Sequence, residues 1–374
     1  MLHLLIDDEI FIYQRFGGVS RIFAILLERL KKEPDINLLF RSTYSENEYL
    51  QAVYPSVYPP FLKNYQFPLK GKIMRGVLKS INHAHIKRQL LSGKVDVFHP
   101  SFYEDFYIES LKKSKAKLVF TVHDLIHEKF PANESDRRMA EKKAANIACA
   151  DKIIVVSEHT KKDLLEQYPF VNPEIIEVIP LSHSLPSISE PIIGLPARYI
   201  LFVGERAGYK NFIQLLQAFE KISREFPDVH LFCAGSRPFS AAENEAIVKA
   251  NLQGKVKQKA LTEGQLKFAY EKALFFVFPS LYEGFGIPIL EAFASQVPVL
   301  ISNRSSLPEV AGEAALQFDP DTAEDLYKQM KLLINDVNLR QELIVLGSNR
   351  VKDFSWEKHY SKTLEVYHSL IRKS

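Results

Sequence analysis

The chain has 374 residues, of which 46% are hydrophobic and 25% are charged, and its formal net charge is +3 at pH 7. These values are ordinary for a globular protein. The length exceeds that of a typical single core, so we expect two domains. No run of 18 apolar residues occurs, which excludes an evident membrane-spanning helix.

The N-terminal residues Met1–Asp7 form an apolar run that lacks basic residues and ends in acidic ones. This pattern is typical of a first buried strand and not of a secretory signal peptide. The two cysteines, Cys149 and Cys233, lie beside alanines in apolar stretches. We expect each to be a buried free thiol, which fits a reducing compartment such as the cytoplasm.

The first half of the chain alternates runs of β-branched and aromatic residues with helical patterns. The expected strands are Leu2–Asp7, Ile36–Arg41, Val95–His99, Lys117–His123, Lys152–Val156 and Ile175–Ile179. The clearest helices are Val19–Lys32, Arg137–Ala150 and Glu158–Gln167. Ser157 precedes the last of these and is a candidate N-cap.

Residues 61–94 carry eight Lys or Arg and no Asp or Glu, with apolar residues interleaved. A basic amphipathic segment of this kind can lie on an anionic membrane, here the inner face of the cytoplasmic membrane. The alternative is a solvated helical face whose apolar side packs on its own domain. No recognition motif accompanies the charge, so we expect no nucleic-acid partner.

A proline-rich stretch, residues 186–197, is the expected linker between a first domain (1–185) and a second (198–352). The second domain repeats the alternation, with strands Tyr199–Gly204, Val229–Gly235, Leu274–Pro279 and Val297–Ser302 and helices Asn211–Glu225, Thr262–Lys272, Pro288–Ser295 and Ala323–Asn335. Strands without polar alternation indicate parallel sheets covered on both faces. We expect the ligand cleft between the domains, and a last helix (353–374) that packs back toward the first domain.

The most informative motif is the segment Glu283–Glu291, which follows a strand directly. Its glycine loop and the helix that Pro288 opens would offer backbone N–H groups and a helix N-terminus to an anion. One carboxylate precedes the loop, and the other lies on the expected first turn of the helix. This combination would suit a ligand with phosphates at one end and hydroxyls at both sides, such as a nucleotide sugar.

Three further clusters follow expected strands. Gly17 and Gly18 open the first long helix, where glycines permit close approach of a ligand but also form plain turns. His123 ends a buried strand, as a ligand contact or as a structural histidine. Arg206 and Lys210 can both reach one anionic group such as a diphosphate, or form a solvated surface turn.

Together these clusters resemble the retaining glycosyltransferases of family 4. The resemblance rests on Gly17-Gly18 and on residues 123–125 (HDL), 156–164 (VSEHTKKDL), 178–184 (VIPLSHS), 204–211 (GERAGYKN), 233–235 (CAG) and, above all, 280–320, with its two spaced glutamates and SLPEVAG. It implies an α/β architecture of the GT-B type, with two Rossmann-like domains whose parallel sheets face each other across a cleft. Within the family the chain is most similar to enzymes of bacterial surface-polysaccharide and lipopolysaccharide assembly, including mannosyltransferases.

The resemblance also implies roles for single residues. The catalytic set would be Arg206 and Lys210 on the diphosphate leaving group, Glu283 on hydroxyls of the transferred sugar, and His123 near that sugar. Glu291 would bind the ribose hydroxyls of the donor. The other implied donor contacts are Gly17, Gly18, Gly284, Phe285, Gly286, Ser305, Ser306 and Leu307. Residues 255–264 lack the family's usual apolar-Gly signature near the base pocket, which leaves the nucleotide open.

We therefore expect a retaining, metal-independent hexosyltransferase without a cofactor, whose partners are a nucleotide-sugar donor and a saccharide or lipid-linked acceptor. GDP-mannose is favoured as donor by resemblance, and UDP-hexoses remain open. The alternatives are a nucleotide-sugar epimerase or hydrolase of the same fold, and a non-catalytic nucleotide-sugar-binding protein. A dehydrogenase is excluded because no Gly-x-Gly-x-x-Gly follows a strand. The acidic run Asp7–Glu9 is expected to be a loop-entry charge cluster and not a metal site.

Overall fold

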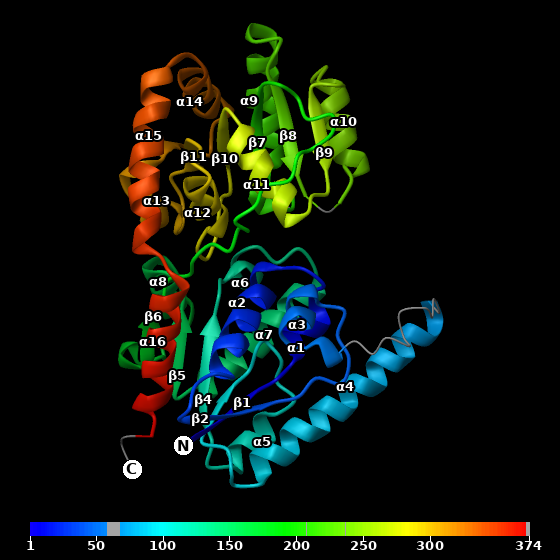
Figure 1. The fold of residues 1–374 in the computed structure, drawn as a ribbon, viewed down its shortest axis with the longest axis vertical. Helices are drawn as coiled ribbons and strands as arrows, with labels where there is room; N and C mark the ends of the chain where they lie inside the picture. The colour runs from blue at the N-terminus through cyan, green and yellow to red at the C-terminus, as the bar shows by residue number, and fades with distance from the viewer. Residues whose placement is uncertain (58–67, 207, 236, 372–374) are drawn as a thin grey trace. The chain divides into compact units, whose positions relative to one another are not determined.

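The computed structural model describes residues 1–57, 68–206, 208–235 and 237–371. The chain divides into two compact units (Figure 1). Unit 1 consists of Met1–Val156, Thr160–Ile179 and Tyr360–Ser374, and unit 2 of Ser157–His159 and Pro180–His359. Each unit is built around one parallel sheet of six strands.

The sheet of unit 1 has the strand order β2-β1-β3-β4-β5-β6, and every pair of neighbours is parallel. The strands are β1 (Leu2–Ile6), β2 (Ile36–Phe40), β3 (Val97–His99), β4 (Lys117–Val122), β5 (Lys152–Val155) and β6 (Ile176–Val178). The apolar side chains of the inner strands β1, β3, β4 and β5 are buried on both faces, as parallel sheets require, whereas most of those of the edge strand β2 are partly buried. The chain passes from β1 to β2 on one side of β1, and β3 then pairs with the other side of β1. This reversal of the strand order makes β1 a topological switch point.

The helices around this sheet differ greatly in length. They are α1 (Glu9–Tyr13), α2 (Gly18–Leu30), α3 (Glu48–Val53), α4 (Pro68–Leu91), α5 (Ile108–Lys112), α6 (Ile126–Lys129), α7 (Glu134–Cys149), α8 (Glu158–Gln167) and α16 (Trp356–Ser369). The side chain of Cys149 is only half-buried, against the expectation of burial, while Cys233 is buried, and both are free thiols. None of the helices in the described part of the chain is both long and apolar enough to cross a bilayer.

Residues near the C-terminus complete the core of unit 1. Tyr360, Val366 and Tyr367 of α16 are buried in one cluster with residues of β1 and α2. The fully buried Tyr367 hydroxyl lies 2.7 Å from His99 Nδ1 at the end of β3. A segment more than 180 residues downstream of the last strand of this sheet is therefore part of its core.

The sheet of unit 2 has the order β12-β11-β10-β7-β8-β9, the arrangement of the classical dinucleotide-binding fold. Its strands are β7 (Tyr199–Val203), β8 (His230–Ala234), β9 (Val256–Lys259), β10 (Phe275–Phe278), β11 (Val299–Ser302) and β12 (Leu316–Phe318). The switch point lies between β7 and β10. The surrounding helices are α9 (Phe212–Glu225), α10 (Ala241–Lys249), α11 (Glu263–Lys272), α12 (Ile287–Ala294), α13 (Leu307–Ala311), α14 (Ala323–Asn335) and α15 (Val337–Arg350).

Candidate active site

The switch point of unit 2 brings together two predicted site residues. Lys210 ends a short 3₁₀ turn after β7, and Glu283 lies in the loop after the neighbouring strand β10. Lys210 Nζ lies 2.5 Å from Glu283 Oε1, and both side chains are mostly buried. The carboxyl ends of parallel strands at a switch point are the usual place for a ligand in open α/β sheets. The pair therefore lies where a nucleotide-type ligand is expected.

The glycine loop beside this pair is held in a fixed shape by serines. Ser305 Oγ accepts a hydrogen bond from the Glu283 N–H (3.0 Å) and donates to its carbonyl oxygen. Ser306 Oγ lies 2.9 Å from the carbonyl oxygens of both Glu283 and Phe285. Ser157 Oγ donates to the Gly284 carbonyl (2.7 Å), a contact within unit 2. The two predicted donor-binding serines thus use their hydroxyls to position the loop.

Gly286 turns the chain from this loop into α12. Its φ of 114° lies in the left-handed region, which favours glycine. An added Cβ would also lie 3.1 Å from Leu307 Cδ2 and 3.2 Å from Ile289 Cδ1. The adjacent Phe285 is buried and packs edge-on to Phe354, with ring centroids 5.7 Å apart. Phe285 and Leu307 therefore support the loop by packing.

Glu291 lies on the second turn of α12, as its fifth residue, and not on the first turn as expected. Its carboxylate is buried and accepts a hydrogen bond from the Tyr270 hydroxyl of α11 (3.2 Å). Burial and the neighbouring Glu291 carboxylate raise the pKa of Tyr270 well above its usual range. The phenol therefore stays a donor that fixes one oxygen of Glu291. Sequence reasoning missed Tyr270, which reads as an apolar position of a helix.

Arg206 has other partners than Lys210. Its guanidinium pairs with Glu243 of α10 (Nε–Oε1, 2.8 Å) and donates to the carbonyl oxygens of Arg237 and Pro238. It also stacks on the Phe239 ring at 4.9 Å, and its side chain is only 4% exposed. Gly235 lies beside the guanidinium, since a Cβ there would be 3.3 Å from Arg206 Nη1 and 2.7 Å from the Gly204 carbonyl oxygen. In this structure Arg206 ties the loop after β7 to the loop after β8.

In unit 1, Gly17 and Gly18 open α2 as predicted, but a side chain covers the helix start. Gln14 Oε1 accepts from the Ser20 N–H (3.1 Å), and a Cβ on Gly17 would lie 2.1 Å from that oxygen. The Ser20 hydroxyl donates back to the Gly17 carbonyl (3.1 Å). A ligand approaching Gly17 would have to displace the Gln14 side chain.

His123 directly follows β4, at the carboxyl end of that strand in the unit 1 sheet, and it is buried. Its N–H donates to the Tyr103 hydroxyl (3.0 Å). The fully buried Lys143 pairs with Glu128 (2.8 Å) and donates to the Asp124 carbonyl (2.9 Å), beneath the same loop. Lys143 Nζ also lies 4.7 Å from the centre of the Tyr103 ring. These supporting residues have no motif in the sequence, because they come from separate helices.

The acidic run Asp7–Glu9, which follows β1 directly, is buried. Asp7 Oδ1 accepts from the N–H (2.9 Å) and hydroxyl of Ser101, and Asp8 Oδ2 accepts from Asn82 Nδ2 (2.5 Å). Burial and the nearby Glu9 carboxylate raise the pKa of Asp7 to about 8, and burial raises that of Asp8 to about 7. Across the described residues, no three His, Cys, Asp or Glu side chains are grouped to hold a metal ion.

Comparison with known families accounts for both units. Residues 16–182 match the family model described as Glycosyltransferase Family 4, and residues 190–349 match Glycosyl transferases group 1. The chain is 28% identical to the O-antigen chain mannosyltransferase B of Escherichia coli over 306 residues, which cover 76% of this chain and 77% of that protein. It is 26% identical to an uncharacterised glycosyltransferase of Methanocaldococcus jannaschii, with 96% of each chain covered.

Solved structures agree in fold. The sucrose-phosphate synthase from Thermosynechococcus elongatus superposes with a TM-score of 0.73 and 20% identity, with both chains covered completely. The Anabaena protein HepE, crystallised with UDP-glucose, gives a TM-score of 0.75 at 14% identity and covers 99% of this chain and 100% of its own. The family models show that the chain belongs to glycosyltransferase family 4, and these neighbours confirm the GT-B fold.

Proposed function

We propose that this glycosyltransferase moves a mannosyl residue from a nucleoside diphosphate sugar to a hydroxyl of a saccharide or lipid-linked saccharide. The anomeric configuration is retained, no metal is needed, and the product is part of a cell-surface polysaccharide. Mannose is chosen because of the similarity to an O-antigen mannosyltransferase. The observation that carries the reaction type is the Lys210–Glu283 pair at the switch point of unit 2.

In the proposed reaction, the bond between the sugar C1 and the diphosphate oxygen breaks while the acceptor oxygen bonds to C1 on the same face. The acceptor hydroxyl gives its proton to the departing phosphate oxygen, and the nucleoside diphosphate leaves. Lys210 exchanges the Glu283 carboxylate for the diphosphate and stabilises its developing negative charge. The N-terminal end of α12 adds the positive end of the helix dipole.

Glu283 and Glu291 recognise hydroxyls in this proposal. Glu283, once released by Lys210, accepts hydrogen bonds from the transferred sugar. Glu291, oriented by Tyr270, accepts them from the ribose. Both carboxylates are mostly buried, and hydrogen bonds to a charged acceptor in such surroundings are stronger than neutral ones. Arg206 would take part only if the donor displaced Glu243.

The direct test is a thermal-shift panel of UDP-, GDP-, ADP- and dTDP-sugars with and without EDTA, followed by product analysis. We expect the sugars of one nucleotide to raise the melting temperature whether or not EDTA is present. NMR of the product formed on a mannoside acceptor should show the anomeric configuration of the donor. Equal donor consumption with and without acceptor would contradict transfer and indicate the hydrolase alternative. Donor binding without turnover would indicate a binding protein.

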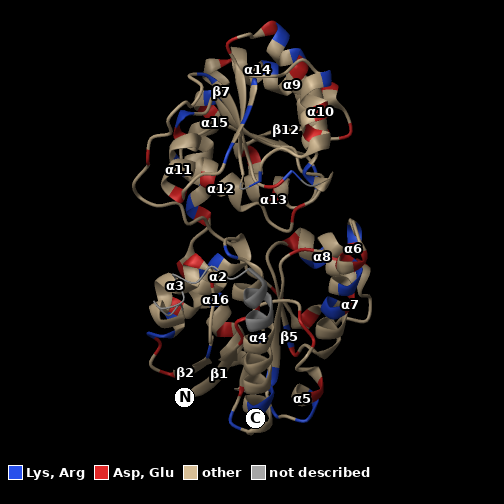
Figure 2. Ribbon diagram, turned by 90° about the vertical axis from the view of Figure 1, so that its right-hand side faces the viewer, with Lys and Arg blue, Asp and Glu red and all other residues tan. Residues whose placement is uncertain are grey.

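We further propose that α4 contacts an anionic membrane surface. Residues 61–67 of the basic segment lie outside the described residues. The charged residues among the described side chains of α4 are all basic (Figure 2). Lys87 and Arg88 are exposed, whereas Lys79 is partly buried and pairs with Glu9 and Glu104. Val77 and Ile81 are 52% and 43% exposed on the same helix. Apolar and basic residues exposed together favour a surface that is apolar beneath an anionic layer.

The membrane proposal is tested with a charge reversal on α4. Lys87→Glu with Arg88→Glu should reduce sedimentation with vesicles that contain anionic lipid, while neutral vesicles bind little in every case. The matched control is Arg137→Glu with Arg138→Glu, which makes the same charge change on the exposed turn of α7 in the same unit. Equal losses for both double variants would mean that only net charge matters, and would exclude a specific contact of α4.

A further inference from the structure

The arginine that ends α15 lies beside the short helix α13 of unit 2. Arg350 Nη2 donates to the carbonyl oxygen of Glu309 (2.8 Å), and its Nε donates to that of Val310 (3.0 Å). The guanidinium also pairs with Asp353 (2.9 Å) and lies 4.9 Å from the centre of the Phe354 ring. The last carbonyl groups of a helix have no partner within the helix, so this arginine completes the C-terminal end of α13.

The other end of α13 holds the glycine loop. The hydroxyl of Ser306, which directly precedes α13, lies 2.9 Å from the carbonyl oxygens of Glu283 and Phe285. Leu307, the first residue of α13, limits the space at Gly286. Because α13 is only five residues long, a shift of its C-terminal end would move these contacts as well.

A second route runs from Arg350 to the same loop through an aromatic pair. The Phe354 ring, which contacts the guanidinium, meets the Phe285 ring edge-on, with the centroids 5.7 Å apart. A cation over a ring face and an edge-to-face pair each favour one arrangement of the rings. One guanidinium therefore contacts both supports of the loop, α13 and Phe354.

We propose that Arg350 is a positioning residue for the donor. It fixes α13 and Phe354, and through them the loop Glu283–Gly286 that contacts the transferred sugar and the phosphates. The inference rests on the proposed transferase function, and it assigns a role in donor binding to a residue that lies outside the donor motif of residues 280–320.

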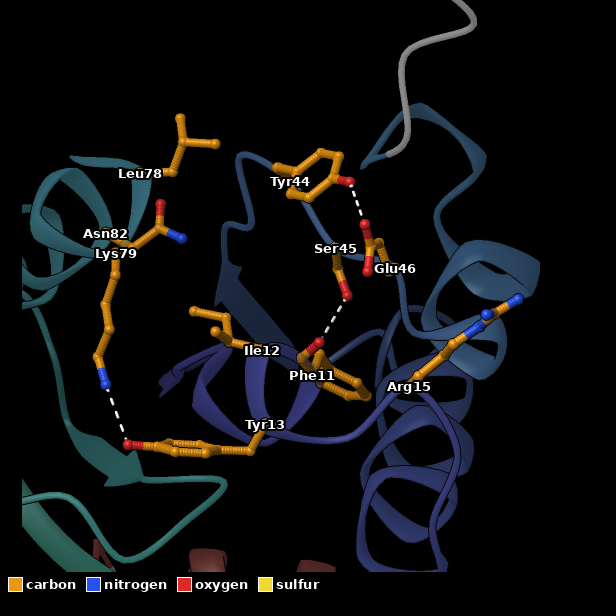
Figure 3. Close-up of a pocket in the computed structure, with 10 residues that line it drawn as sticks. All are labelled: Phe11, Ile12, Tyr13, Arg15, Tyr44, Ser45, Glu46, Leu78, Lys79 and Asn82. Atoms are coloured by element: carbon orange, nitrogen blue, oxygen red, sulfur yellow. Dashed lines mark hydrogen bonds between the residues drawn. The ribbon is translucent and has the colours of Figure 1, made fainter. Parts of the chain in front are cut away.

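The partners of Arg350 distinguish it from a cation that binds side chains. Lys79 of unit 1 is such a cation, since its Nζ lies 3.1 Å from the Tyr13 hydroxyl (Figure 3) and it pairs with two carboxylates. Arg350 donates to two main-chain carbonyls and so constrains the path of the chain itself. The planar fork of a guanidinium reaches both at once, whereas the ammonium of a lysine is a compact point charge.

The first experiment examines the loop without a ligand, by hydrogen–deuterium exchange on the full chain. Arg350→Met removes the donors and keeps an unbranched side chain. It should speed exchange of the amides of residues 283–286 at least about threefold, because the loop loses hydrogen bonds that hold its support. Equal exchange of these amides in wild type and Arg350→Met would refute the positioning role.

The matched control is Arg340→Met. Arg340 Nη1 likewise donates to the carbonyl oxygens of Leu333 and Ile334, near the C-terminal end of α14, a helix that packs on α9. This variant should leave exchange of residues 283–286 at the wild-type rate. Equally fast exchange in both methionine variants would overturn the assignment, because it would make the effect one of general stability.

The second experiment measures nucleotide affinity by calorimetry with UDP, GDP, ADP and dTDP. Arg350→Met should weaken the nucleotide that the wild type binds at least about threefold, whereas Arg340→Met should keep the wild-type Kd. Arg350→Lys should give an intermediate Kd, because a point charge replaces only part of the fork. A wild-type Kd in Arg350→Met would refute the inference.

Phe354→Leu tests the second route and serves if Arg350→Met fails to fold. It keeps an apolar side chain but removes the edge-to-face pair with Phe285, so exchange of residues 283–286 and the nucleotide Kd should both rise. With transfer established, both variants should raise the donor KM at least about threefold and leave the acceptor KM within about twofold. A wild-type donor KM in both would refute the inference while the transferase stands.

Failure of the proposed function gives a different result. If the wild type binds none of the four nucleotides and transfers no sugar, the transferase proposal fails. Exchange of residues 283–286 that is faster in Arg350→Met than in Arg340→Met would then still show that Arg350 fixes the loop.

Discussion

Lys210 Nζ lies 2.5 Å from Glu283 Oε1, and the two residues come from loops that follow neighbouring strands of unit 2. Loss of this lysine should depress turnover. We expect Lys210→Ala to lower kcat at least about tenfold, which corresponds to about 1.4 kcal/mol in the barrier, because the leaving diphosphate loses a positive charge.

The control for that change is Lys221→Ala. Lys221 also pairs with a glutamate, Glu324 (2.6 Å), but both side chains are about half exposed on the surface of unit 2. Its kcat should equal that of the wild type in the same assay. A wild-type rate for Lys210→Ala would remove Lys210 from the diphosphate site.

Glu291→Ala should weaken donor binding strongly, because the ribose hydroxyls lose a charged acceptor held by Tyr270. We expect at least about a tenfold rise in Kd, on the scale of 1.5–3 kcal/mol for a hydrogen bond to a charged group. Calorimetry with the nucleotide diphosphate measures it. A 2′,3′-dideoxy nucleotide should bind wild type and variant alike, and unchanged affinity for the ribonucleotide would refute the assignment.

Tyr270→Phe should have a smaller effect of the same kind. The ring remains packed, but one oxygen of Glu291 loses its donor, so the preference for ribose over dideoxyribose should fall about threefold or more. Tyr199→Phe is the matched control, since Tyr199 is equally buried and its hydroxyl donates only to the Ala269 carbonyl (2.6 Å). A similar loss of preference in both variants would mean that Tyr270 acts through general packing.

Arg206→Ala should act mainly on stability. The change leaves Glu243 without its partner at a mostly buried position and frees the carbonyl oxygens of Arg237 and Pro238. We expect a loss of about 2–4 kcal/mol in the free energy of unfolding, measured by urea denaturation. Lys210→Ala should cost less, because Lys210 bonds to one partner, Glu283, whereas Arg206 bonds to three. Full stability of Arg206→Ala with lost activity would instead restore the predicted diphosphate role.

Asp7 predicts a pH dependence of stability. Its pKa is about 8 in the folded protein, raised by burial and by Glu9, and near 3.9 in the unfolded chain. The folded state therefore holds an extra proton between these values, and stability falls as the pH rises toward 8. Asp7→Asn mimics the protonated acid and should remove about 2 kcal/mol of the loss between pH 6 and pH 8. Parallel pH profiles of wild type and variant would show that Asp7 is ionised throughout.

The sequence predicted most of the two sheets because buried parallel strands are continuous apolar runs. Ten of the twelve strands were expected near their observed bounds, and the missing ones are β9 and β12, at the edges of the unit 2 sheet. The strand β9 has the sequence VKQK. Its lysines protect an exposed sheet edge from pairing with other chains, and they interrupt the apolar run by which a strand is predicted. The helix α15 was missed because only Leu343 and Gly347 are buried on it, so it shows no apolar stripe.

The site was predictable where one segment carries it and not where distant segments meet. Glu283 and Glu291 share one motif, and Lys210 follows from its place after a strand. The partners Tyr270 and Glu243 could not be predicted, because their contacts with Glu291 and Arg206 depend on how helices dock in three dimensions. Arg206 and Lys210 are four residues apart, but a 3₁₀ turn separates them and their side chains take different partners.

The hydrogen bond between Tyr367 and His99 has a consequence for protein synthesis. A ribosome delivers the six strands of unit 1 first, yet the core of that unit stays open until the residues of α16 emerge. Unit 2 can close earlier, because its own residues end at His359. The unit made first is therefore the one completed last. A stop codon after about residue 359 should produce a chain in which unit 2 is folded and unit 1 is not. Chaperones and proteases should then recognise the N-terminal half of the chain, and not the unit next to the truncation.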